Sequence, residues 1–140
     1  MNSQKGMTLV ELLSIVVVAA IIILIAVPAY ARYEREAKLQ EAFSTLITLH
    51  SKEDQYWAEK HSYGRSDCAI GMLAANTRHF MFTCSIDKGR KGYLITANGQ
   101  EDLLNYNFTI DQSGKMATTG FPGVKRLPVS CWLDTPGTCA

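Results

Sequence analysis

The sequence lacks a charge bias of either sign. Its 140 residues carry 14 lysines and arginines against 13 aspartates and glutamates, so no general excess of positive charge points to nucleic acid or anionic lipid. It also contains no HExxH motif and no glycine-rich phosphate loop, and its three histidines are scattered. We therefore predict that the chain is not an enzyme and holds no cofactor and no metal.

Glycine and proline are missing from residues 30–62, and this favours a helix there. Apolar side chains recur in steps of three and four and form one stripe: Leu39, Ala42, Phe43, Leu46 and Leu49. The pattern predicts an amphipathic helix over about 30–62, with Gly64 as its stop signal. His50 lies on the same stripe, where a hydrogen-bonded core histidine is favoured over a ligand.

An apolar run with a single charge precedes this helix. Residues 7–29 are 23 in number and contain only Glu11 as an ionisable group. About 20 apolar residues span the hydrocarbon core, so the run predicts a transmembrane helix continuous with the amphipathic one. Pro28 is expected to kink or locally melt it. A carboxylate in such a segment is costly and marks a functional site, although Glu11 could also simply rest at the headgroup level.

A secretory signal is a poor interpretation of this run, which is longer than the usual apolar region and has a weakly cleavage-like end. In KGMTLVELLSIVVVAAIIILIAVPAY, Gly6 stands immediately before the run, and Glu11, inside the run, is the fifth residue after Gly6. This arrangement resembles the signal of the type IV prepilins, in which a glycine precedes the cut. Met7 departs from the pattern, since the family usually has phenylalanine there, but methionine is similarly apolar.

The resemblance implies a processing and assembly route. The bond between Gly6 and Met7 would be cut by a prepilin peptidase, and the freed amine of Met7 would be methylated. Glu11 would then face the Met7 ammonium of a neighbouring subunit inside the filament core, where an unpaired charge is costly. Before assembly the chain would cross the inner membrane once, with its head in the periplasm; afterwards it would lie in a pilus at the cell surface.

After residue 78 the apolar period becomes two. Segments 79–86, 93–98 and 105–111 are predicted strands, with a short fourth strand near 115–120. The expected turns are 87–92, Asn98-Gly99 and 112–115, and residues 100–104 could extend the connection after Asn98-Gly99. A turn of helix is expected over 72–76. On the third strand, Tyr106, Phe108 and Ile110 should share the buried face. The prediction is an α+β fold in which the long helix packs on a small antiparallel sheet.

Four cysteines all follow the apolar run, which indicates two disulfides in an oxidising compartment. Cys131 and Cys139 enclose seven residues with Pro136-Gly137 as a turn, so that ring closes easily. Cys68 would then pair with Cys84. The alternative, in which Cys68 or Cys84 is tied to the tail, stays open.

The remaining charged groups give weaker signals. The acid pairs Glu53-Asp54 and Glu101-Asp102 are interpreted as solvated surface, and Asp111 is a poor calcium ligand by itself. His79 with Cys84 lacks the partners for a zinc site. Two basic spots are candidate DNA contacts: Lys88, Arg90 and Lys91 in one turn, and Lys125 with Arg126 in the tail.

The predicted layout is a leader (1–6), a transmembrane and assembly helix (7–29) and a head domain (30–140). Helix, connector, sheet and disulfide-closed C-terminal loop together resemble the type IVa pilins, and YNFTIDQSGKMATTG followed by CW resembles the PilE-like minor pilins. The resemblance implies a structural subunit of a type IV pilus whose partners are other pilins and the inner-membrane assembly machinery. The alternatives are a DNA-binding or adhesive receptor on the fibre and a type II secretion pseudopilin.

Overall fold

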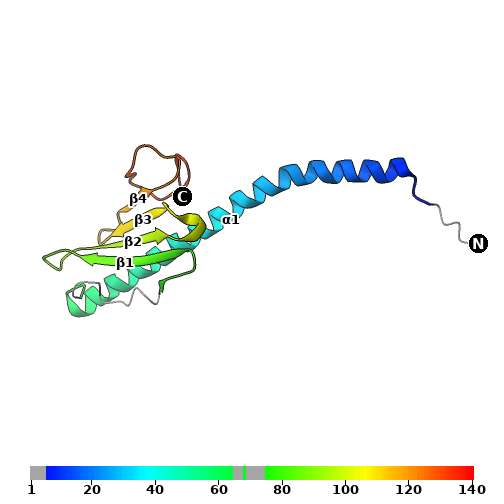
Figure 1. Ribbon diagram of the computed structural model, residues 1–140. Helices are drawn as coiled ribbons and strands as arrows, with labels where there is room; N and C mark the ends of the chain where they lie inside the picture. Colours follow the sequence, from blue (N-terminus) through cyan, green and yellow to red (C-terminus); the bar gives the residue numbers. More distant parts are fainter. Residues whose placement is uncertain (1–5, 65–67, 69–74) are drawn as a thin grey trace, which may run out of the picture. The chain divides into compact units, whose positions relative to one another are not determined.

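The computed structural model describes residues 6–64, 68 and 75–140 (Figure 1). The chain divides into two compact units, Met1–Arg35 and Glu36–Ala140, and each is described by itself. The turn of helix expected over 72–76 lies largely outside the described residues.

One long helix, α1 (Leu9–Lys60), supplies residues to both units and has 52 residues. Its first turn is capped by Thr8, whose Oγ1 accepts the backbone N–H of Glu11 at 3.3 Å. The helix continues on both sides of Pro28, so the chain does not unwind at that residue.

The C-terminal end of α1 differs from the prediction at Gly64. The helix ends at Lys60, and His61 takes the left-handed conformation (φ 52°) while donating its N–H to Trp57 O at 2.8 Å. Gly64 also has a positive φ, of 93°, but it lies beyond this terminal turn. Gly64 is therefore not the stop signal, because the turn that ends a helix needs its left-handed residue directly after the last helical one.

Four antiparallel strands form the main sheet in the order β1-β2-β3-β4. They are β1 (Phe80–Ile86), β2 (Tyr93–Gly99), β3 (Asn107–Asp111) and β4 (Met116–Gly120), with a short 3₁₀ helix, η2 (Glu101–Leu103), between β2 and β3. The predicted strands, including the fourth, are confirmed to within two residues. Consecutive strands pair with their neighbours, as expected for short hairpin connections.

The turn predicted at Asn98-Gly99 is wrong, because both residues belong to β2. A Cβ added to Gly99 would lie 2.0 Å from the Leu103 carbonyl oxygen and 2.8 Å from that of Tyr106. The connection over 100–106 folds back directly onto this strand end. Gly99 is thus required for close backbone approach within a strand and not for turning the chain.

The core lies between the second half of α1 and one face of the sheet. The predicted stripe is buried, and Phe43 at its centre meets Phe108 of β3 edge to face, with ring centroids 4.8 Å apart. Tyr106, Phe108 and Ile110 are at most 7% exposed, as the alternation predicted. Helix and sheet therefore share one hydrophobic core.

The tail contains a second, two-stranded sheet that the sequence did not predict, formed by β5 (Leu133–Thr135) and β6 (Thr138–Cys139). Buried Thr118 of β4 holds this tail: its hydroxyl donates to Cys131 O at 2.7 Å and accepts the Leu133 N–H at 3.0 Å. Trp132 donates its indole N–H to Thr109 O at 2.8 Å and stacks on Phe43. The tail is thereby part of the core.

Candidate functional site

The first part of α1 presents apolar side chains to solvent on every side. All residues from Gly6 to Arg35 are exposed, and Leu9 and Leu24 retain 80% and 76% of their accessible surface. By length and composition, α1 is the one helix in the described part of the chain that could cross a membrane. An apolar surface of this extent needs lipid or protein around it, because water solvates it poorly.

Glu11 is the single acidic residue of this surface before Glu34. It occupies the third position of the helix, so its carboxylate lies at the positive end of the helix dipole. Among the residues that the structure describes, no ion pair involves this carboxylate. The pattern Thr8-x-x-Glu11 is that of a capping box, and half of the box is formed, since Thr8 Oγ1 accepts the Glu11 N–H. The sequence reasoning missed this structural role, although the pattern is visible in the sequence.

Gly6 and Met7 precede the helix in exposed, non-helical chain. A Cβ added to Gly6 would meet no atom within 4 Å, and Gly6 is not one of the glycines with positive φ. Nothing in the local structure therefore requires glycine at this position.

Both disulfides join the cysteines that the favoured pairing named. Cys131 is bonded to Cys139, with Cα atoms 5.8 Å apart, and closes the β5–β6 hairpin. Cys68 is bonded to Cys84 in β1, with Cα atoms 5.9 Å apart. The two bridges brace the edges of the head unit and leave the core to apolar packing.

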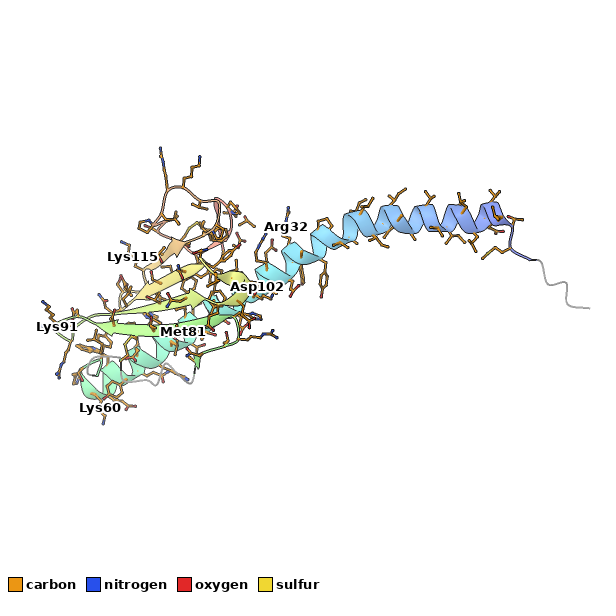
Figure 2. All side chains as sticks on the ribbon, viewed as in Figure 1. Arg32, Lys60, Met81, Lys91, Asp102 and Lys115 are labelled. Atoms are coloured by element: carbon orange, nitrogen blue, oxygen red, sulfur yellow. A yellow bond between two sulfur atoms is a disulfide. The ribbon has the colours of Figure 1, made fainter. Side chains whose placement is uncertain are left out.

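The two basic spots lie in loops at opposite ends of the main sheet. Lys88, Arg90 and Lys91 are exposed in the β1–β2 turn, where Figure 2 shows Lys91 at the tip. Lys125 and Arg126 are exposed in the loop that follows the other end of the sheet, after β4. The sheet therefore does not bring the five residues together into one patch.

The interpretation of Glu53 as solvated surface is wrong, because its side chain is fully buried. Glu53 continues the apolar stripe at a step of four from Leu49, which is the signal that the sequence offered. Its neighbour Asp54 is exposed on the adjacent face. The two acids therefore differ because a helix turns 100° between consecutive residues.

His50 is a hydrogen-bonded histidine at the rim of the core, as expected. Its Nδ1 lies 2.5 Å from the Tyr93 hydroxyl, and its Nε2 lies 3.4 Å from a carboxylate oxygen of Asp54. The Tyr93 hydroxyl is also 3.3 Å from the other oxygen of Asp54. Burial raises the pKa of Tyr93 far above its ordinary value, and the neighbouring Asp54 carboxylate adds to the rise.

This raised pKa predicts alkaline destabilisation. The unfolded chain releases the Tyr93 proton near pH 10, whereas the folded chain retains it. The contribution to stability is therefore complete below pH 10 and is lost as the pH rises above that value. We expect the denaturant midpoint to fall more steeply above pH 10 in the wild type than in Tyr93→Phe. The exposed Tyr33→Phe is the control, and equal slopes for wild type and Tyr93→Phe would contradict the prediction.

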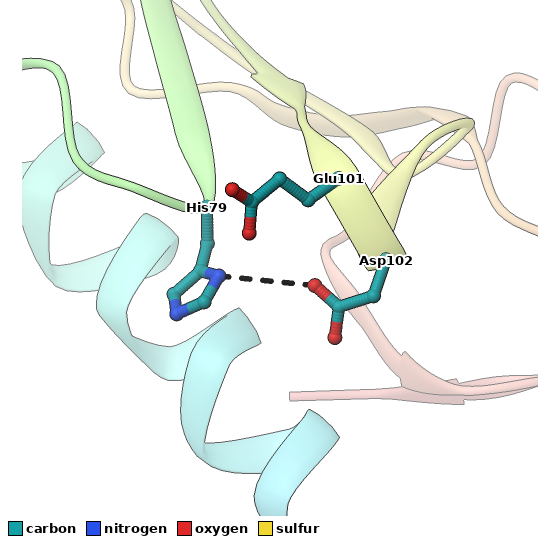
Figure 3. A group of neighbouring side chains, drawn as sticks. All are labelled: His79, Glu101 and Asp102. Carbon is teal, nitrogen blue, oxygen red and sulfur yellow. Dashed lines mark ion pairs between the residues drawn. The ribbon is translucent and has the colours of Figure 1, made fainter.

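His79, Glu101 and Asp102 form the group most like a metal site in the described residues, with candidate ligand atoms within 4.8 Å of one another (Figure 3). The pairing of Phe80 with Gly99 brings their segments together. Lys38 Nζ lies 2.7 Å from Asp102 Oδ2 and Arg78 Nε lies 3.2 Å from Glu101 Oε2.

Both carboxylates of this group are thus already matched to cationic side chains. The hydrogen bond from Lys38 is the main cause that lowers the pKa of Asp102. His79 Nδ1 lies 3.8 Å from Asp102 Oδ1. Both acids are exposed, as expected for solvated surface. The ion pairs through which this surface cluster joins α1 to η2 were not predicted.

Asp111 closes the β3–β4 turn. Its Oδ1 accepts the N–H and hydroxyl of Ser113, at 2.8 and 2.6 Å, and the N–H of Lys115 at 3.0 Å. Burial raises the pKa of this carboxyl, but the hydrogen bonds outweigh it, so the pKa lies below the usual value. The carboxylate stabilises the turn through these hydrogen bonds, as is common for aspartate.

Known proteins resemble this chain in sequence and in fold. No protein-family model matches the chain. The chain is 27% identical over 94 residues to fimbrial protein EcpC of Eikenella corrodens, covering 67% of this chain and 61% of that protein. It is 28% identical over 104 residues to prepilin peptidase-dependent protein D of Escherichia coli K12, covering 74% and 68%. Type II secretion system core protein G of Dickeya chrysanthemi matches at 27% over 70 residues, covering 50% and 46%.

Two solved structures share the fold. The non-core minor pilin PilV of Neisseria meningitidis matches with a TM-score of 0.53 and 17% identity, covering 64% of this chain and 91% of that one. A type IV pilin of Shewanella oneidensis matches with a TM-score of 0.50 and 13% identity, covering 59% and 89%. The long helix on a four-stranded antiparallel sheet is therefore the type IV pilin fold.

Proposed function

We propose that this chain is a structural subunit of a type IV pilus, and more specifically a minor pilin. The chain has the fold of the type IV pilins, and its relatives include fimbrial proteins and pilins. One observation carries the proposal. The apolar half of α1 is exposed on every side and holds one carboxylate, Glu11, at the distance from Gly6 that the prepilin signal has.

The apolar part of α1 suits two successive environments, the membrane and the filament. As a single span it lies in the inner membrane, with the disulfide-braced head in the periplasm. In the filament the same side chains contact the helices of other subunits, which replace lipid as their surroundings. The partners are therefore other pilins, the membrane and the assembly machinery that moves subunits from one to the other.

Processing by a prepilin peptidase fits the local structure at residues 6 and 7. The Gly6–Met7 bond lies in exposed chain ahead of the helix, where a peptidase can reach it. Glycine is not needed there for folding, which supports a role in recognition by the peptidase. Cleavage frees the amine of Met7 for methylation.

Glu11 gives the subunit its register. Its carboxylate pairs with the Met7 ammonium of a neighbouring subunit, while apolar side chains supply adhesion. Burial of an ion pair is tolerated, but burial of one charge alone costs several kcal/mol, on the order of 3–5. A subunit docked one step out of place leaves Glu11 unpaired and is rejected. In this role the protein is an assembly component and not an enzyme.

A pseudopilin of type II secretion is the second candidate, and the match to core protein G favours it. Both candidates use the same helix. The C-terminal hairpin closed by Cys131 and Cys139 favours the pilus. A DNA receptor is not favoured, because the two basic spots lie at opposite ends of the sheet.

Mass spectrometry of surface filaments sheared from cells tests the proposal. We expect the chain in the filament fraction at low abundance, with an N-terminal peptide that begins at methylated Met7. An intact Gly6–Met7 bond in the filament fraction would refute the processing step. Enrichment with secretion components, and none in pili, would favour the pseudopilin.

A further inference from the structure

Two arginines stand just past the end of the apolar run, where a membrane-spanning helix would reach the lipid headgroups. Leu9 to Ala29 is 21 residues, or roughly 31 Å of helix, which matches the hydrocarbon thickness of about 30 Å. Arg32 and Arg35 follow Ala29 by about 4.5 and 9 Å of helix rise. Arginine side chains are long enough to reach back toward a headgroup from these positions.

Arginines and tyrosines lie on different sides of α1 in this segment. Arg32 and Arg35 are three residues apart and share one side of α1, whereas Tyr30 lies about 200° away from Arg32 at 100° per residue. Tyr30 and Tyr33 are 70% and 75% exposed, and tyrosines of this kind collect at membrane interfaces. Glu36 lies on the same side as Arg32, one turn further along the helix, and directly follows Arg35.

A hollow of about 310 Å³ adjoins Arg32 and is lined by Ile25, Pro28, Ala29 and Arg32. These residues follow steps of three and four, so they form one column on the helix. The compact Pro28 and Ala29 leave a notch between the longer Ile25 and Arg32. The notch is apolar toward the membrane and cationic at its outer end, where Figure 2 shows Arg32 projecting from the helix.

Both arginines are available for an external anion. Ion pairs elsewhere in the described residues involve Lys38, Arg78 and two histidines, and none of those pairs involves Arg32 or Arg35. A guanidinium binds phosphate through several N–H groups at once. The combination of apolar notch and guanidinium matches an acyl chain that ends in a phosphate.

We infer that the column Ile25–Pro28–Ala29–Arg32, together with Arg35, binds an anionic phospholipid at the periplasmic headgroup level while the subunit waits in the membrane. The inference rests on the membrane stage of the proposed function and adds a partner to it. The bound lipid holds the span at a fixed depth in the membrane.

Spin-labelled lipids test this in the full chain reconstituted into phosphatidylcholine bilayers with about one third phosphatidylglycerol. We expect labelled phosphatidylglycerol to be immobilised in preference to labelled phosphatidylcholine, with selectivity reduced about fivefold by Arg32→Gln and by Arg35→Gln. Ala29→Leu fills the notch and should also lower the selectivity without changing the charge. Arg78→Gln, which removes the same charge from the head, is the matched control.

Several outcomes overturn the inference. They are equal immobilisation of both lipids by the wild type, an equal loss in Arg78→Gln, and displacement of the lipid by inorganic phosphate. Filament incorporation is measured in parallel, so the two proposals fail separately. An Arg32→Gln protein that enters filaments normally leaves the proposed function untouched, whatever the lipid result.

Discussion

Replacement of Glu11 by glutamine is expected to lower incorporation into filaments by about a hundredfold or more, with membrane insertion unchanged. The variant leaves the Met7 ammonium of the neighbouring subunit without its partner in an apolar interior, at a cost on the order of 3–5 kcal/mol. Glu11→Ala and Glu11→Val should show the same loss. Immunoblots of membrane and sheared-filament fractions measure both quantities.

Glutamine separates ion pairing from helix capping. Position 11 is the third residue of α1, and glutamine serves a capping box as glutamate does. If Glu11 acted only as a cap, Glu11→Gln would assemble normally while Thr8→Ala would be defective. Glu59→Gln, an exposed acid in the last turn of α1, controls for the change in net charge. Normal assembly of Glu11→Gln would eliminate the pairing mechanism.

Replacement of Gly6 by valine should have the second large effect. The variant should block removal of residues 1–6 almost completely. The side chain meets no atom of the folded chain, so the fold and the membrane span should be preserved. The defect should instead lie in the fit of the branched side chain to the peptidase. Intact-mass measurement of the membrane fraction should show the uncut chain, and the filament fraction should lack it.

Gly89→Val is the control for the introduction of valine at an uncrowded glycine. A Cβ added to Gly89 would come no closer than 3.8 Å to any atom outside the neighbouring residues. That variant should be cut and assembled as the wild type is. Removal of residues 1–6 from Gly6→Val at the wild-type rate would contradict the assigned cleavage site. Alanine at position 6 should fall between the two, because its side chain is smaller.

Periodicity predicted the parts of this fold that depend on burial along one element. The stripe around Phe43 and the inward face of β3 carry their signal in residues three, four or two positions apart, and the structure buries both. Glu53 has the same spacing as the stripe, but glutamate is seldom fully buried, so its charge favours an exposed position. For that residue the position on the helix decided its burial.

Features that depend on distant backbone were not predictable in this way. Asn98-Gly99 has the composition of a turn, yet Gly99 serves to let the loop at Leu103 and Tyr106 approach β2. His61 ends α1 although Gly64 is the stronger local signal. Likewise, the ion-pair cluster around Asp102 needs the β1–β2 register and the helix together. Each of these is fixed by tertiary contacts that sequence spacing does not encode.

The stacking of Trp132 on Phe43 makes the core depend on a contact between distant parts of the chain. The two rings are separated by 89 positions in the chain, so this contact is among the most non-local in the head. Until Trp132 takes its place, the helix stripe lacks the indole ring that stacks on Phe43, and the sheet lacks the indole hydrogen bond to Thr109. Completion of this core therefore depends on a contact that forms only after the C-terminal segment has joined the helix and the sheet.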